Sequence, residues 1–255
     1  MVCGHSGSIP NRLCANLPQW RNSILPAVGN DVVDLRHPDA LKKSLDDRFV
    51  NRVFLPEEQN QINQAGDPDC ILWVLWAAKE TAYKIISKSD PSIHSGPLRY
   101  AVYLHDPTTF SLHDPGFQNT FLTCQVESPG GPVMLGVLIG QDYIHTFGCR
   151  GDQSHPGTLH LKVFRLDHPC WKEQTESEVV RKSLCRHLGH FWQMVSSRIE
   201  VRREERVRGL GPPFVYVDGK RGAADVSLSH HGRFGAFAVF VDDSLFAKSP
   251  FPENL

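Results

Sequence analysis

Charged side chains interrupt two apolar segments of the sequence. Asp31 lies in the Val-rich run Ala27–Leu35, where burying a carboxylate is costly unless a positive charge meets it. Glu80 and Lys84 are one helical turn apart, so their side chains can reach the same point. Two carboxylates from separate elements can bind one Mg²⁺ and leave its other positions to waters and phosphate oxygens. Asp31 and Glu80 are therefore candidate metal ligands, and Lys84 is a candidate phosphate partner.

Each of these residues also has a structural interpretation. Asp31 could cap the turn that follows its strand. Glu80 and Lys84 could form an exposed i,i+4 pair worth only about 0.2–0.5 kcal/mol. Lys79 falls within the apolar arc of the same predicted helix, where a nearby anionic ligand would explain an ammonium group.

A polar group, Ser229-His230-His231, ends a strand-like run. The G-x-S-x-G elbow of a serine nucleophile is absent there. His230 could cap a turn or donate to a phosphate. A zinc site from His145 and Cys149 is weakly supported, because a spacing of four on a strand does not bring ligands together.

The hydrophobic periodicity predicts the elements that would position these side chains. Apolar residues recur at about 100° per residue between Ile71 and Ile86, which predicts a helix carrying Glu80 and Lys84. A second helix is expected over Ser177–Val195. Short apolar runs separated by turn residues predict antiparallel strands. The runs are Ala27–Leu35, Leu98–Leu104, Phe121–Val126, Val133–Ile139, Tyr143–Cys149, Leu159–Phe164, Ile199–Val207, Phe214–Val217, Val226–Phe234 and Gly235–Val241.

The composition is that of an ordinary soluble protein, with 40% hydrophobic and 22% charged residues. A formal charge of −1 provides no overall field toward nucleic acid or an anionic membrane. Neither a signal-peptide core nor a run of about 18 apolar residues is present. We expect a cytoplasmic protein without nucleic-acid or membrane partners. The seven cysteines form no C-x-x-C pair, so we expect free thiols in a reducing compartment.

Together the motifs resemble those of the 4'-phosphopantetheinyl transferases. The family's G-x-D strand is matched by Gly29-Asn30-Asp31, and its W-x-x-K-E-x-x-x-K helix by Trp76 to Lys84. Its S-x-S-H strand is matched by Ser227 to His230. Further matches are Arg48-Phe49, Arg52, Glu58, Gly211-Pro212-Pro213 and Asp218-Gly219.

The order of the motifs is that of the short, trimeric acyl-carrier-protein-synthase type, whereas the length is that of the long, monomeric type. The resemblance therefore implies an α+β, 4'-phosphopantetheinyl transferase-like fold. We expect two similar α+β halves, joined in swapped order and packed as a pseudo-dimer with antiparallel sheets. The expected division is an irregular segment 1–26, a half 27–168 with the G-x-D and W-x-x-K-E-x-x-x-K motifs, a half 169–245 with the S-x-S-H motif, and a tail 246–255. A trimer of short enzymes carrying inserted strands is the alternative.

The resemblance implies transfer of 4'-phosphopantetheine from coenzyme A to a serine of an acyl or peptidyl carrier protein, releasing 3',5'-ADP. It implies Asp31, Glu80 and Lys84 as the catalytic group, with Mg²⁺ on the two acids. Long members often carry a second acid two residues after the strand Asp, where this chain has Val33. Asp34 would face the other side of a regular strand, so we expect water to complete the metal shell.

Four residues are implied in coenzyme A binding, and His230 would contact the 3'-phosphate. They are Lys79, Lys84, Ser229 and His230. Two other functions stay open from the sequence. One is a non-catalytic coenzyme A- or carrier-protein-binding module of the same fold, and the other is a zinc hydrolase using His and Cys residues.

Overall fold

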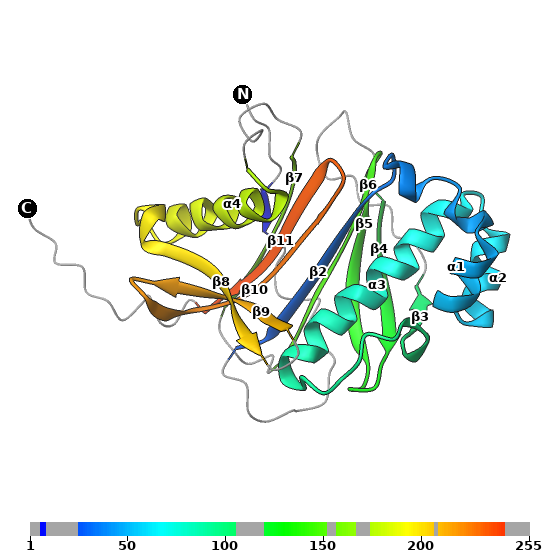
Figure 1. Ribbon diagram of the computed structural model, residues 1–255, viewed down its shortest axis with the longest axis horizontal. Coiled ribbons are helices and arrows are strands. Elements are labelled where there is room, and N and C mark those ends of the chain that lie inside the picture. The colour runs from blue at the N-terminus through cyan, green and yellow to red at the C-terminus, as the bar shows by residue number, and fades with distance from the viewer. Residues whose placement is uncertain are drawn as a thin grey trace, which may run out of the picture.

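The protein folds into two antiparallel sheets, and a long helix packs on each (Figure 1). The computed structural model describes residues 6–8, 25–105, 120–151, 157–166, 174–206 and 209–242. The mixture of helices with antiparallel sheets confirms the predicted α+β class.

Sheet 1 contains the G-x-D strand and has the order β2-β6-β5-β4-β3. Its strands are β2 (Ala27–Asp34), β3 (Ala101–Leu104), β4 (Thr120–Glu127), β5 (Val133–Ile139) and β6 (Tyr143–Arg150). Between β2 and β3 the chain forms α1 (Asp47–Val53), α2 (Pro56–Gln64) and α3 (Pro68–Ser89). Helix α3 packs on β2 and β6, and its apolar side joins the core of this half.

Sheet 2 contains the S-x-S-H strand and has the order β1-β7-β11-β10-β9-β8. Its strands are β1 (Ser6–Ser8), β7 (Thr158–Arg165), β8 (Ile199–Arg206), β9 (Gly209–Val217), β10 (Lys220–His231) and β11 (Phe234–Val241). Helix α4 (Glu176–Phe191) covers β8, β10 and β11. Leu184 and Leu188 of α4 are fully buried against this sheet.

Local sequence explains where α3 begins. Asp67 is its N-cap, and the carboxylate accepts a hydrogen bond from Cys70 N at 3.0 Å. Pro68 follows at the first helical position, where a missing N–H costs nothing. The predicted helix Ile71–Ile86 lies within these bounds. Because its flanks are also covered, α3 is buried on more than its predicted apolar arc.

The two sheets share one connectivity. In each, a strand is followed by the long helix and then by four antiparallel strands, the last of which pairs with the first. The series β2, α3, β3, β4, β5, β6 corresponds in this way to β7, α4, β8, β9, β10, β11. The same strand order thus occurs twice in the chain.

The chain passes from sheet 1 to sheet 2 between Arg150 and Thr158. Strand β7 therefore belongs to sheet 2, although it lies within the half predicted over 27–168. Its alternating pattern predicts a strand but not the neighbour with which it pairs. Residue 168 and the tail 246–255 lie outside the described residues. The segment 1–26, predicted to be irregular, contains β1, which pairs with β7.

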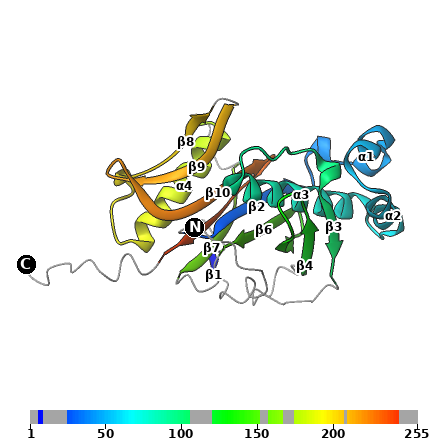
Figure 2. The same ribbon diagram turned by 90° about the horizontal axis from the view of Figure 1, so that it is seen from below.

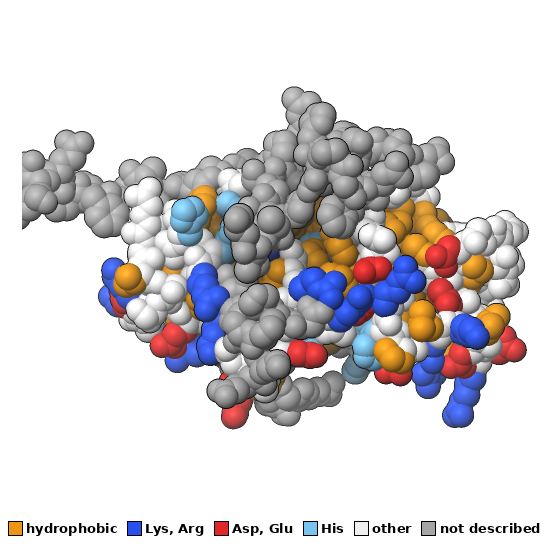
Figure 3. All heavy atoms as spheres, turned by 90° about the horizontal axis from the view of Figure 1, so that it is seen from above, with side chains coloured by type: hydrophobic (Ala, Val, Ile, Leu, Met, Phe, Trp, Pro, Cys, Tyr) orange, Lys and Arg blue, Asp and Glu red, His pale blue; other side chains and the backbone are white. Residues whose placement is uncertain are grey.

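The sequence predicted that every cysteine is a free thiol, and this is wrong for one of the described cysteines. Cys149 at the end of β6 is disulfide-bonded, whereas Cys70, Cys124 and Cys185 are free. Among the described residues no helix is long and apolar enough to cross a membrane. Seen from above, acidic and basic side chains are interspersed over the described surface (Figure 3).

Candidate functional site

Helix α3 approaches β2 very closely because residue 29 is glycine. A Cβ at Gly29 would lie 2.5 Å from the Thr81 carbonyl oxygen and 2.6 Å from a side-chain carbon of Ile85. The missing side chain lets the middle of α3 lie directly on the G-x-D strand. This contact places the next turn of α3 over Asp31.

Lys84 joins the two elements at that point. Its ammonium donates to Asp31 Oδ1 at 2.7 Å and to the Asn30 carbonyl oxygen at 2.9 Å. The Asp31 side chain is 15% exposed and that of Lys84 is 29% exposed, so a ligand can still reach both. The structure therefore brings the predicted Asp31 and Lys84 together.

Glu80 lies at the same place, one turn before Lys84. Burial raises its pKa, the negative charge of Asp31 raises it further, and Lys84 opposes these effects. Two carboxylates whose charges act on one another favour a cation between them. No group of three or more His, Cys, Asp or Glu side chains is placed to hold a metal within the described part of the chain. A cation held by these two carboxylates would need its other ligands from outside the protein.

The S-x-S-H strand forms the opposite side of the site. Strand β10 lies beside β2 (Figures 1 and 2). Ser229 points toward β2, where its Oγ accepts a hydrogen bond from Asn30 Nδ2 at 2.9 Å. His230 points to the other side, toward α4, where its Nδ1 lies 2.8 Å from Glu176 Oε2. Both Ser229 and His230 thus lie across the β2–β10 boundary from the carboxylates.

Lys79 is not part of this group. Its side chain is 2% exposed, and Nζ lies 2.7 Å from Glu58 Oε2 of α2. The ammonium also donates to the carbonyls of Pro97 and Tyr100. Burial lowers the pKa of Lys79, and Glu58 opposes this effect. The predicted contact of Lys79 with coenzyme A is therefore replaced by an internal ion pair.

Asp34 is also separate from the carboxylate pair. Its side chain is 1% exposed and receives two hydrogen bonds from the Arg233 guanidinium, at 2.8 and 2.7 Å. Arg36 N and Arg233 N donate to it as well. Burial alone would raise the pKa of Asp34, but these donors hold it well below its usual range. The carboxylate is fully occupied by protein groups.

Two residues near the site were given no role by the sequence patterns. His231 accepts a hydrogen bond from Asp34 N at 3.0 Å, and burial lowers its pKa. Lys88 extends the four-residue series of Glu80 and Lys84, and binds Asp225 of β10. The four-residue spacing after Glu80 and Lys84 could have identified Lys88. Strand alternation after His230 could have identified His231 as a side chain on the same face as Ser229.

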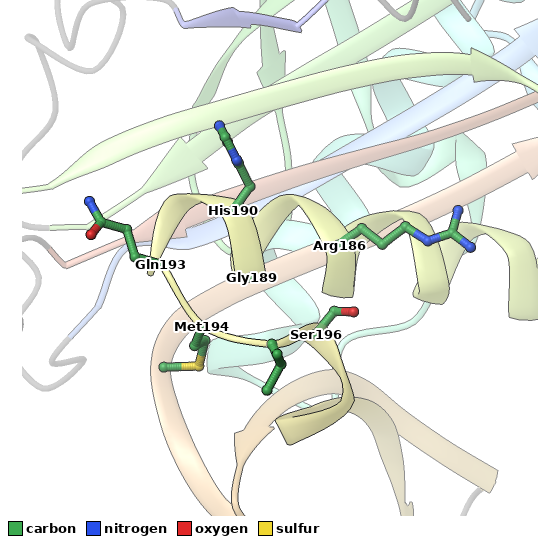
Figure 4. A pocket seen from close by; sticks show the side chains of 7 residues that line it. Arg186, Gly189, His190, Gln193, Met194 and Ser196 are labelled. Carbon is green, nitrogen blue, oxygen red and sulfur yellow. The ribbon is translucent and has the colours of Figure 1, made fainter.

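A surface cavity of about 590 Å³ lies elsewhere, at the C-terminal end of α4 (Figure 4). Its lining includes Arg186, His190 and Gln193. None of the predicted site residues lines this cavity. We therefore do not assign the functional site to it, despite its size. The candidate site is the boundary between β2 and β10 beneath α3.

Residues 27–146 match the family model of the 4'-phosphopantetheinyl transferase superfamily. The matched stretch includes Asp31, Glu80 and Lys84, whereas the S-x-S-H strand lies beyond it. The match confirms the resemblance found in the motifs. No curated protein and no solved structure matches the chain.

Proposed function

We propose that this chain transfers 4'-phosphopantetheine from coenzyme A to a serine hydroxyl of an acyl or peptidyl carrier protein, releasing 3',5'-ADP. The superfamily domain at residues 27–146 supports such a transfer in general. One observation supports this chain as a catalyst: Lys84 bonds to Asp31 while Glu80 shares the electrostatic environment of both. A purely binding module has no need for two partly buried carboxylates around one lysine.

Asp31 and Glu80 are proposed to hold Mg²⁺. Burial raises the pKa of Glu80, and the charge of Asp31 raises it further against the effect of Lys84, so a bound cation would relieve the repulsion between the acids. When bound there, Mg²⁺ would supply positive charge to the pyrophosphate oxygens of coenzyme A. The proposal assigns water and substrate oxygens to its remaining positions.

Lys84 is proposed to act on the transferred group. In the structure its ammonium is held by an ion pair with Asp31 and by the Asn30 carbonyl, and these two contacts fix its position. From there it would stabilise negative charge on the pyrophosphate or assist removal of the serine proton. Displacement at phosphorus depends mainly on such positioning and charge neutralisation.

Ser229 and His230 are proposed to contact coenzyme A from the second sheet. His230 is 41% exposed and already pairs with a carboxylate, Glu176 at the start of α4. A phosphate that displaced Glu176 would meet the ring and the nearby helix N-terminus. We assign this position to the 3'-phosphate, as the family resemblance implies.

The repeated connectivity supports a monomeric pseudo-dimer. Each sheet is built from a strand, a helix and four further strands in the same order. The proposed site uses β2 and α3 from the first unit, and β10 and the start of α4 from the second. One chain therefore supplies both walls, whereas a trimer would need a second chain for one of them. Light scattering of the purified protein separates the two states.

The test of the function is labelling of an apo carrier protein. With Mg²⁺ and a fluorescent coenzyme A, the chain should transfer label to the carrier serine. Asp31→Asn and Glu80→Gln should abolish labelling while the circular dichroism spectrum stays unchanged. Full activity in both variants would overturn the metal assignment. Coenzyme A binding without labelling of any carrier in a panel would favour the non-catalytic module.

A further inference from the structure

The boundary between the two sheets is held by side chains bonded to backbone. Three backbone N–H groups of β2 donate to side chains of β10, and each partner lies 197 residues further along the chain. The pairs are Val28 N to Asp225 Oδ2 at 2.7 Å, Asn30 N to Ser227 Oγ at 3.0 Å, and Asp34 N to His231 Nδ1 at 3.0 Å. A constant offset means that the strands run in the same direction. Their register is therefore set by the identity of particular side chains.

Asn30 lies at the centre of this boundary and is fully buried. Its Nδ2 donates to Ser229 Oγ at 2.9 Å and lies 3.3 Å from His145 Nε2. Burial, followed by the charge of Lys84, lowers the pKa of His145 to about 3, so this ring is neutral. The Asn30 carbonyl oxygen accepts the hydrogen bond from Lys84. One residue thus contacts both the S-x-S-H strand and the catalytic lysine.

The side chain of Asn30 is not fully satisfied. Its Oδ1 is buried and meets no hydrogen-bond donor in the described part of the chain. Turning the amide over would let Oδ1 accept from Ser229 and His145, but would leave Nδ2 without an acceptor. Either orientation carries an uncompensated desolvation cost. A buried polar group retained at such a cost calls for a role beyond packing.

We infer that Asn30 is a positioning residue of the transferase site, which holds the S-x-S-H strand in register with Lys84 and Asp31. Its side chain fixes Ser229, and its carbonyl fixes Lys84. The inference rests on the proposed function, since it concerns how that site is assembled. Asn30 is too deeply buried to touch coenzyme A itself, and it acts through Ser229.

A double-mutant cycle tests this role. Asn30→Ala should raise the KM for coenzyme A about 10-fold, the equivalent of one hydrogen bond, and leave kcat nearly unchanged because the Lys84 contact uses the backbone. Ser229→Ala should raise KM at least as much, because it also removes the proposed contact of Ser229 with coenzyme A. The double variant should be no worse than Ser229→Ala alone, because Asn30 acts through the bond that Ser229→Ala already removes. Effects that multiply in the double variant, or a fall in kcat with KM unchanged, would overturn the inference.

Two further variants separate positioning from stability. Ser229→Thr keeps the hydroxyl group, so its KM should lie much closer to the wild-type value than the KM of Ser229→Ala. Leu184→Ala truncates a fully buried residue of α4 away from this boundary. It should lower the urea midpoint without changing KM. If Leu184→Ala changed KM as much as Asn30→Ala, general destabilisation would explain the effect and the positioning role would be lost.

The contact between Asn30 and Ser229 can also be tested by a measurement that does not depend on enzymatic activity. In the wild type, the Asn30 side-chain amide protons should exchange slowly with water by NMR, and Ser229→Ala should accelerate the exchange. If the wild type neither binds coenzyme A by calorimetry nor labels a carrier, the proposed function fails. Slow exchange that is lost in Ser229→Ala would then still support the contact between the sheets. Rapid exchange in the wild type would overturn the positioning role whatever the activity.

Discussion

Gly29 of β2 lies directly against the backbone of Thr81 in α3, and a Cβ at residue 29 would come within 2.5 Å of the Thr81 carbonyl oxygen. Backbone atoms cannot move aside as a flexible side chain can, so any side chain at this position must separate strand from helix. The separation would act on the same turn of α3 that presents Glu80 and Lys84. Close helix–strand packing and the geometry of the site therefore depend on one residue.

Gly29→Ala should lower both stability and activity. We expect a loss of about 1–3 kcal/mol in the free energy of unfolding, the usual cost of overpacking a buried contact. Carrier labelling should fall by more than the loss of folded protein explains, because Lys84 moves away from Asp31. Urea unfolding and labelling rates measure the two effects. Gly66→Ala is the control, since a Cβ there meets nothing within 4 Å, and wild-type labelling in Gly29→Ala would contradict the argument.

Lys79 and Lys84 should respond differently to the same substitution. Lys79→Met breaks an ion pair whose partners are 2% and 3% exposed, and leaves Glu58 unpaired. We expect a stability loss of about 3–5 kcal/mol, with an unchanged KM for coenzyme A in the protein that remains folded. Lys84→Met should cost less than about 1 kcal/mol, because its pair is partly exposed, yet reduce labelling by about 100-fold or more.

Urea unfolding and steady-state labelling of both variants measure this contrast. Lys43→Met, which breaks a pair with side chains 28% and 42% exposed, is a control for loss of a surface lysine. It should alter neither measurement appreciably. A large rise in KM for Lys79→Met at full folding would restore Lys79 as a contact of coenzyme A.

Periodicity explains why the position of α3 was predictable and the partner of Lys79 was not. Spacing of about 100° per residue places Lys79 in the apolar arc, and the structure buries it there. The partner, Glu58, comes from another helix, and no local pattern specifies which acid will meet a buried ammonium. A ligand was the expected partner, whereas the protein supplies its own.

Strand alternation had the same limit. It predicts that Ser229 and His230 point to opposite sides, as they do. It does not predict which side faces β2, because that depends on how the two sheets pack. The contact of His231 with Asp34 N and the pairing of β7 with β11 are likewise set by packing between segments far apart in the chain. Fold class and motif residues were therefore accessible from the sequence, and their partners were not.

The Asp34–Arg233 pair should make stability depend on acid pH. The pKa of Asp34 is lowered in the folded protein, so the native state favours the charged carboxylate more than the unfolded chain does. This contribution is fully present above the unfolded pKa of about 3.9, and is lost as pH falls below that value toward the folded pKa. Asp34→Asn removes it, and should cost about 1.5–3 kcal/mol at pH 7, because the charge-assisted hydrogen bonds from Arg233 to Asp34 are lost while Arg233 keeps Asp142 nearby.

Urea unfolding at pH 7, 5 and 3 measures the difference between wild type and Asp34→Asn. The difference should be the same at pH 7 and 5, and smaller at pH 3, where other carboxylates titrate equally in both proteins. Asp39→Asn is the control, at a surface carboxylate that is 88% exposed, and it should change the stability little at any of the three pH values. A difference that stayed constant down to pH 3 would show that Asp34 is not ionised differently in the two states.

Binding of Mg²⁺ should stabilise the wild type through Asp31 and Glu80 and not through Asp34. A ligand at 100 times its Kd stabilises the folded state by about 2.7 kcal/mol, which corresponds to a rise in Tm of roughly 5–10 °C for a chain of this size. Asp31→Asn and Glu80→Gln should lose most of this rise. Asp34→Asn should keep it despite a lower starting Tm, because the Asp34 carboxylate is already bound by Arg233. Thermal unfolding with increasing Mg²⁺ gives the answer, since a rise that survived in both Asp31→Asn and Glu80→Gln would place the metal elsewhere.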